Sequence, residues 1–75
     1  MGARAFPPLV LDAAHSVRAG ESLDRAVGWY WCLGGGERRA AVDEWILATG
    51  HPLAQEPGTA EQRFRALVRE AIAGD

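Results

Sequence analysis

The chain has 75 residues, a formal net charge of −2 and a single cysteine, Cys32. One cysteine excludes an internal disulfide, and the acidic balance lacks the basic surplus that gives proteins affinity for nucleic-acid phosphates. The longest apolar run is far shorter than the roughly 20 residues that a membrane-spanning helix needs. We therefore expect one small cytoplasmic domain over residues 1–75, with no membrane contact and with nucleic acid a disfavoured partner.

The small size and the residue usage add two expectations. A domain of this length buries only about 60% of the surface that its unfolded chain exposes, so its stability is marginal and either oligomerisation or a partner would help it. All of the positively charged side chains are arginines, and the chain is rich in alanine, arginine and glycine. This usage is typical of a GC-rich bacterial genome.

Prolines and glycines divide the chain into four segments, each with an apolar period near 3.6 residues. None of the segments shows the strict alternation of a half-buried strand. The predicted fold class is therefore all-α, a compact bundle of four short helices over about residues 7–19, 22–33, 37–49 and 59–73.

The first predicted helix starts at Pro7 and Pro8, because a fixed φ suits the first helical turn and the missing N–H is not needed there. Gly20 is expected to end it in a left-handed conformation. Its apolar face consists of Leu9, Val10, Ala13, Ala14 and Val17.

The second predicted helix has Ser22 as its N-cap. The three glycines Gly34–Gly36 are expected to end the helix as a non-helical turn, because residues without Cβ lose much backbone entropy in a helix. One face follows the core period, and three apolar side chains fall outside it. The core face comprises Leu23, Ala26, Val27, Tyr30 and Trp31, and the side chains outside it are Trp29, Cys32 and Leu33.

The third and fourth predicted helices carry recognisable ends. Gly50 caps the third helix and Pro52 bars its continuation, while Thr59 and Gln62 have the spacing of a capping box at the start of the fourth. Arg39 and Asp43 are predicted to form a surface ion pair. The core candidates are Ala41, Val42, Trp45, Ile46 and Ala48 in the third helix, and Phe64, Leu67, Val68, Ala71 and Ile72 in the fourth.

The residue types that carry chemistry are few and widely spaced. His15, His51 and Cys32 lack the close spacing of a metal site. We expect His15 to be exposed, His51 to lie in a loop beside a proline, and Cys32 to be buried among aromatic side chains and chemically inert. The sequence therefore predicts no metal, no cofactor and no enzymatic activity.

The aromatic cluster around Trp29 supports two interpretations. In the first, Trp29, Tyr30, Trp31 and Trp45 all fill one core. In the second, Trp29 and Leu33, four residues apart on one helix, form a surface patch, since tryptophan is among the residues most enriched at interface hot spots.

Two further features favour the surface patch. Gly28 lies in mid-helix, where glycine costs up to about 1 kcal/mol relative to alanine, and a common reason to tolerate it is the close approach of another helix. Arg38 and Arg39 oppose the dipole of the third helix unless an acidic partner lies there. We therefore place both arginines at the rim of the patch.

The leading prediction is a non-enzymatic protein–protein interaction module, either a small adaptor or a self-associating helical domain that recruits or masks a larger protein. Its predicted contact residues are Trp29, Leu33, Arg38 and Arg39. The alternative is a small regulator with a helix-turn-helix, in which the third helix presents Arg38 and Arg39 to DNA.

Overall fold

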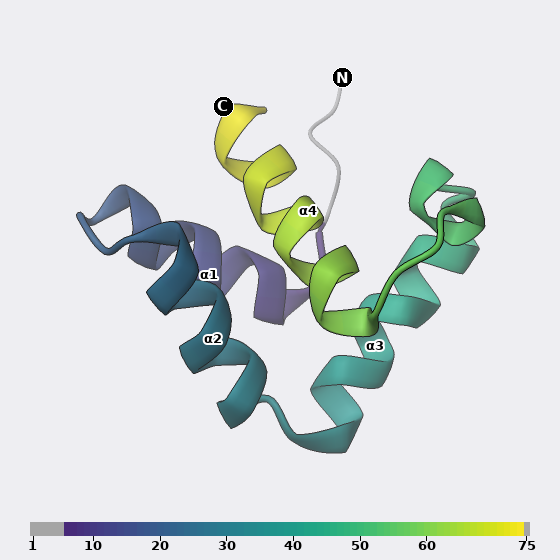
Figure 1. The fold of residues 1–75 in the computed structure, drawn as a ribbon, viewed down its shortest axis with the longest axis horizontal. Coiled ribbons are helices and arrows are strands. Elements are labelled where there is room, and N and C mark those ends of the chain that lie inside the picture. Colours follow the sequence, from purple (N-terminus) through teal and green to yellow (C-terminus); the bar gives the residue numbers. More distant parts are fainter. Residues whose placement is uncertain (1–5, 75) are drawn as a thin grey trace.

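The computed structural model describes residues 6–74, so residues 1–5 and 75 of the predicted domain lie outside the description. Residues 6–74 form four α-helices and one short 3-10 helix, with no strand among them, and Figure 1 shows how the helices are arranged. The all-α bundle of four short helices is confirmed. The elements are α1 (Pro8–Arg18), α2 (Leu23–Leu33), α3 (Gly35–Ala48), η1 (Pro52–Gln55) and α4 (Ala60–Ala73).

The predicted helix ends are confirmed at three places. The Ser22 side chain accepts a 3.1 Å hydrogen bond from the Arg25 backbone N–H at the start of α2. Thr59 and Gln62 form the complete capping box before α4, with bonds of 3.1 Å to the Thr59 hydroxyl and 2.9 Å to the Gln62 amide oxygen. Gly20 follows α1 with φ of 118°, a conformation that glycine adopts without steric cost.

The glycine turn is shorter than predicted. Gly34 alone separates α2 from α3, and α3 begins at Gly35 instead of near Glu37. Gly34 keeps helical dihedrals, with φ of −66° and ψ of −27°, and Gly35 has φ of +66°. One residue in the left-handed region is enough to redirect the chain, so Gly36 remains helical and the expectation of a three-residue turn is wrong.

Gly34 is also a packing position. A Cβ atom there would lie 2.9 Å from Cδ2 of Leu9, too close for a normal contact. The missing side chain therefore allows the start of α1 to pack directly against the junction of α2 and α3.

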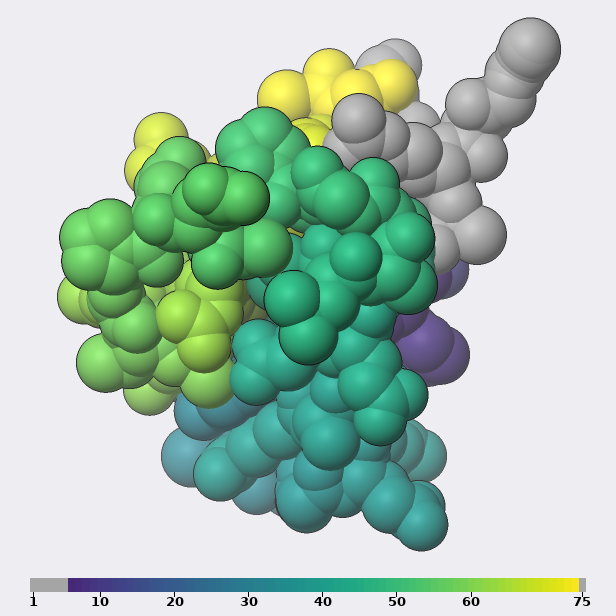
Figure 2. Space-filling model, turned by 90° about the vertical axis from the view of Figure 1, so that its right-hand side faces the viewer, coloured from purple at the N-terminus to yellow at the C-terminus, as the bar shows by residue number. Residues whose placement is uncertain are grey.

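The core lies between α1 and α4, which make the most extensive contact between helices, and α2 packs across both. Figure 2 shows the side formed by α3 and η1, with η1 and the loop after it beside α3 and next to visible atoms of α4. The core is purely apolar. Its buried side chains are Leu9, Val10, Ala13, Ala14, Val27, Val42, Ile46, Phe64, Leu67, Val68 and Ala71.

Candidate interaction surface

The side of α2 that points away from the core carries exposed apolar side chains. Trp29 is 64% exposed and Leu33 is 61% exposed. Both are large apolar side chains that a chain this small would normally bury in its core. Because they are four residues apart on one helix, the two side chains are neighbours on its surface. We call Arg25, Gly28, Trp29, Cys32 and Leu33 together the outer face of α2.

The other aromatic residues pack inward, so the interpretation with all four in one core is wrong for Trp29. Trp31 stacks on Phe64 with ring centroids 5.2 Å apart, and Trp45 stacks on Phe6 at the same separation. Tyr30 packs partly buried against the core. Three aromatic side chains of the cluster therefore stabilise the fold, and the fourth is left on the surface.

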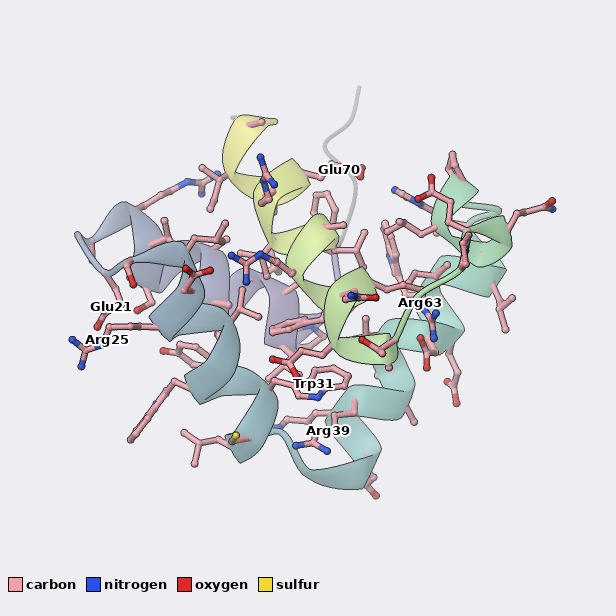
Figure 3. All side chains as sticks on the ribbon, viewed as in Figure 1. Glu21, Arg25, Trp31, Arg39, Arg63 and Glu70 are labelled. Carbon is pink, nitrogen blue, oxygen red and sulfur yellow. The ribbon has the colours of Figure 1, made fainter. Side chains whose placement is uncertain are left out.

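A groove of about 320 Å³ lies beside Trp29, between the end of α1 and the outer part of α2. At its edge Arg25 Nε lies 3.8 Å from Glu21 Oε1, and Figure 3 shows both side chains at the same end of α2. The side chains of this ion pair are largely solvent-exposed, so the pair contributes little to stability. The groove is lined by Ser16, Glu21, Arg25, Ala26, Trp29 and Tyr30.

Gly28 has no partner within the fold. Beyond its own stretch of helix, a Cβ atom built on Gly28 would meet no atom of residues 6–74 within 4 Å, so the expected close approach of another helix does not occur in the described part of the chain. The cost of a mid-helix glycine is therefore unexplained by the packing of the monomer.

Cys32 is exposed, which corrects the expectation that it is buried among the aromatic residues. The helical period had placed Cys32 outside the core face, and burial was expected only because aromatic residues are its neighbours in the sequence. Successive residues are separated by about 100° around a helix, so Cys32 faces outward while Trp31 faces the core. Cys32 thereby joins Trp29 and Leu33 on the outer face.

Arg39 is engaged within the fold. Its Nε donates a 2.8 Å hydrogen bond to the Trp31 carbonyl, and its guanidinium lies 4.8 Å from the centroid of the Trp31 ring. Figure 3 shows the two side chains together below the core. The positive charge of Arg39 is unfavourable near the N-terminal end of α3. The same charge lies at the C-terminal end of α2, where the helix dipole favours a cation and offsets that cost.

The predicted ion pair of Arg39 with Asp43 is replaced by other contacts. Asp43 Oδ1 lies 3.4 Å from Nε of Arg63 in α4, while Arg39 turns toward Trp31. Arg38 is exposed in the first turn of α3. Of the four predicted contact residues, Trp29 and Leu33 lie together on α2, Arg38 follows on the next helix, and Arg39 is partly buried.

His51 lies in the loop directly before Pro52, as predicted, and its side chain is only 10% exposed. Its Nδ1 accepts a 3.1 Å hydrogen bond from the Leu53 N–H, and its Nε2 donates to Glu70 Oε1 at 2.7 Å. The ring is also tilted over Trp45, 5.9 Å between centroids. His51 therefore caps η1 and ties it to α4, and the His-Pro pair at the start of a turn was the signal that could have revealed the cap.

His15 is exposed, as expected. Within residues 6–74 no group of three or more His, Cys, Asp or Glu side chains is arranged to hold a metal ion. Nor does any described helix have the length and apolar character needed to cross a membrane.

No protein-family model, curated protein or solved structure matches this chain. The function is therefore inferred from the geometry of the outer face of α2 and from the chemistry of its residues.

Proposed function

We propose that the protein is a non-enzymatic protein–protein interaction module whose contact surface is the outer face of α2. The observation that carries the proposal is the exposure of Trp29 beside Leu33, at 64% and 61%. Complete burial of a fully exposed leucine contributes about 1.5–3 kcal/mol and that of a tryptophan more, and these two side chains retain over half of that exposure for a partner to cover. Among residues 6–74 Trp29 has no stacked ring partner, so this gain remains available for binding.

The reactive side chains support a non-enzymatic role. Both ring nitrogens of His51 are occupied by contacts that hold η1 against α4, which leaves neither free to act as a base. Cys32 lies on the convex outer side of α2 and is not among the residues that line the neighbouring groove. A nucleophile without a binding cleft and an orienting base is a poor catalyst.

Leu47 provides a matched control for experiments on this surface. It is 71% exposed, but it lies on α3 and lines a separate recess with Ala54 and Arg63. Leu47→Ala therefore removes a comparable apolar side chain without touching the outer face of α2.

The proposal is tested by capture of partners on immobilised protein from a lysate of the organism of origin. We expect wild type and Leu47→Ala to retain the same polypeptide, and Trp29→Ala and Leu33→Ala to lose it. Circular dichroism first shows that each variant is folded. If all four proteins capture the same set of polypeptides, the outer face of α2 is not the contact surface.

A DNA-binding regulator that uses α3 as its reading helix has weaker support. A helix-turn-helix joins its helices by a turn of about three or four residues, whereas Gly34 alone connects α2 to α3. The exposed residues of α3 include Glu37, Glu44 and Leu47. Several arginines bind other parts of the fold: Arg18 to the Ala71 carbonyl, Arg39 to the Trp31 carbonyl, Arg63 to Asp43 and Arg65 to Asp24.

Binding to random duplex DNA at low salt tests this alternative, because the electrostatic contribution is strongest there. We expect no binding. Binding that weakens steeply as salt is added would favour the regulator over the interaction module.

A further inference from the structure

We propose that the occupant of the outer face of α2 is a second copy of the same chain, with the two α2 helices packed antiparallel and crossing at Gly28 and Trp29. This inference rests on the proposed function and specifies its partner. Its basis is that the outer face is complementary to itself in shape and in charge, which is the requirement for a two-fold symmetric interface.

Gly28 fits the centre of such a crossing. Apart from its own stretch of helix, no described atom lies within 4 Å of the position of its Cβ, so the backbone of α2 is open to close approach from outside. A two-fold axis between Gly28 and Trp29 brings the Gly28 backbones of the two copies together on one side. On the other side it brings the two Trp29 indoles into contact, where aromatic rings stack favourably.

The groove beside Trp29 fits the same arrangement. An antiparallel crossing at this point places Leu33 of each copy opposite residues 24–26 of the other, on the side where the groove opens. The groove has about 320 Å³, and beside the polar Ser16, Glu21 and Arg25 it is lined by Ala26, Trp29 and Tyr30, on which a leucine side chain can pack. Each copy thus supplies one projecting leucine and one groove, so a symmetric dimer contains two identical contacts of a leucine with a groove.

The charges of the outer face are also compatible with a second copy. The antiparallel crossing places Arg25 beside Cys32 of the second copy, at the C-terminal turn of α2, where the helix dipole favours a cation. That turn has no basic residue of its own. Glu21 and Arg25 carry opposite charges at the other end of the face, so two copies meet without net repulsion.

The size of the face predicts a weak dimer. α2 has 11 residues and is therefore about 16 Å long, too short to bury the roughly 800 Å² per partner of a typical stable complex. We expect a dimer that forms and dissociates with concentration.

Sedimentation equilibrium across a wide concentration range measures this directly. We expect the average mass of the wild type to rise from the 8.1 kDa of one chain toward twice that value. Trp29→Ala should raise the dissociation constant by about 30-fold, the size of effect that defines an interface hot spot. Leu47→Ala should leave it unchanged. A wild type that stays monomeric at all concentrations overturns the inference.

Gly28→Gln distinguishes an effect on the dimer interface from an effect on the stability of the monomer. The new side chain enters open space in the monomer and replaces glycine by a good helix former, so the thermal midpoint of the monomer should not fall. The same side chain would hold the two helices apart and weaken the dimer as strongly as Trp29→Ala does. Dimerisation unaffected by Gly28→Gln would contradict a crossing at this residue.

Arg25→Cys tests the antiparallel register. Residues 25 and 32 are separated by about 10 Å along one helix, beyond the reach of a disulfide, so a bond between them must join two copies. With oxidised glutathione as the oxidant, reduced to two molecules of glutathione for each disulfide formed, we expect Arg25→Cys to give a covalent dimer through Cys32. Leu47→Cys is the control and should cross-link much less. Equal cross-linking of the two variants overturns the register.

The results also separate this inference from the proposed function. A strictly monomeric protein that still captures a polypeptide through Trp29 would refute the second copy and leave the interaction module standing. A protein that neither dimerises nor captures a partner would refute both.

Discussion

The Nε atom of Arg39 donates a 2.8 Å hydrogen bond to the backbone carbonyl of Trp31, so the second turn of α3 holds the end of α2 in place. The guanidinium also covers the Trp31 ring, at 4.8 Å from its centroid. This contact joins the two helices that meet at Gly34. It fixes the direction of the C-terminal part of α2, from which Leu33 projects.

Replacement of Arg39 by alanine should therefore lower the free energy of unfolding by about 1.5–3 kcal/mol, the range for a hydrogen bond to a charged group. Arg38→Ala is the matched control, because the exposed Arg38 is the neighbouring residue and its loss should change stability by less than about 0.5 kcal/mol. Urea unfolding followed by circular dichroism measures both. Equal effects of the two substitutions would show that the contact with Trp31 contributes nothing.

Adjacent glycines at the start of α3 should respond to alanine in opposite directions. Gly35 has φ of +66°, where a side chain costs about 1–2 kcal/mol, so Gly35→Ala should destabilise the protein by that amount. Gly36 is helical with open space around its Cβ position, so Gly36→Ala should stabilise it by about 0.4–1 kcal/mol. Thermal unfolding of both variants measures the sign of each stability change. Shifts of the same sign would contradict a hinge confined to Gly35.

His51→Ala should destabilise the region where η1 meets α4. The substitution removes the acceptor for the Leu53 N–H and one hydrogen bond to Glu70, in a place where the His51 side chain is only 10% exposed. We expect a loss of about 1–3 kcal/mol. His15→Ala, at an exposed histidine, is the control and should be nearly neutral. A neutral result at His51 would mean that its two hydrogen bonds do not stabilise the protein.

Neighbouring tryptophans should also differ sharply. Trp31 stacks on Phe64 at 5.2 Å, so Trp31→Ala should cost about 3 kcal/mol or more of unfolding free energy. Trp29→Ala, on the outer face, should cost less than about 0.5 kcal/mol when measured at a concentration where the chain is monomeric. A large loss for Trp29→Ala under these conditions would show that Trp29 stabilises the monomer.

The local features of the fold could be predicted from the sequence, because they depend on residues close together in the chain. The period of 3.6 residues indicates that Val27 and Trp31 share one face of α2 and that Trp29 and Leu33 fall outside it. The cap at Ser22 likewise depends on a residue only three positions away. Such signals are contained within one or two helical turns.

Contacts between distant residues could not be predicted in the same way. Glu70 is 19 residues from His51, and nothing near His51 in the sequence indicates that α4 brings a carboxylate to its ring. Arg39 has an acidic residue four positions ahead, the spacing of a helical ion pair, but the change of chain direction at Gly35 brings the Trp31 carbonyl within its reach instead. These outcomes depend on how whole helices are placed.

If the outer face of α2 contacts another protein molecule, photo-cross-linking in the cells of origin captures that contact. A benzophenone amino acid in place of Trp29 should give a cross-linked adduct, either with a second copy of the chain or with a different polypeptide. The same amino acid in place of Leu47 should give none. No adduct at position 29, or equal adducts at both positions, would contradict the claim.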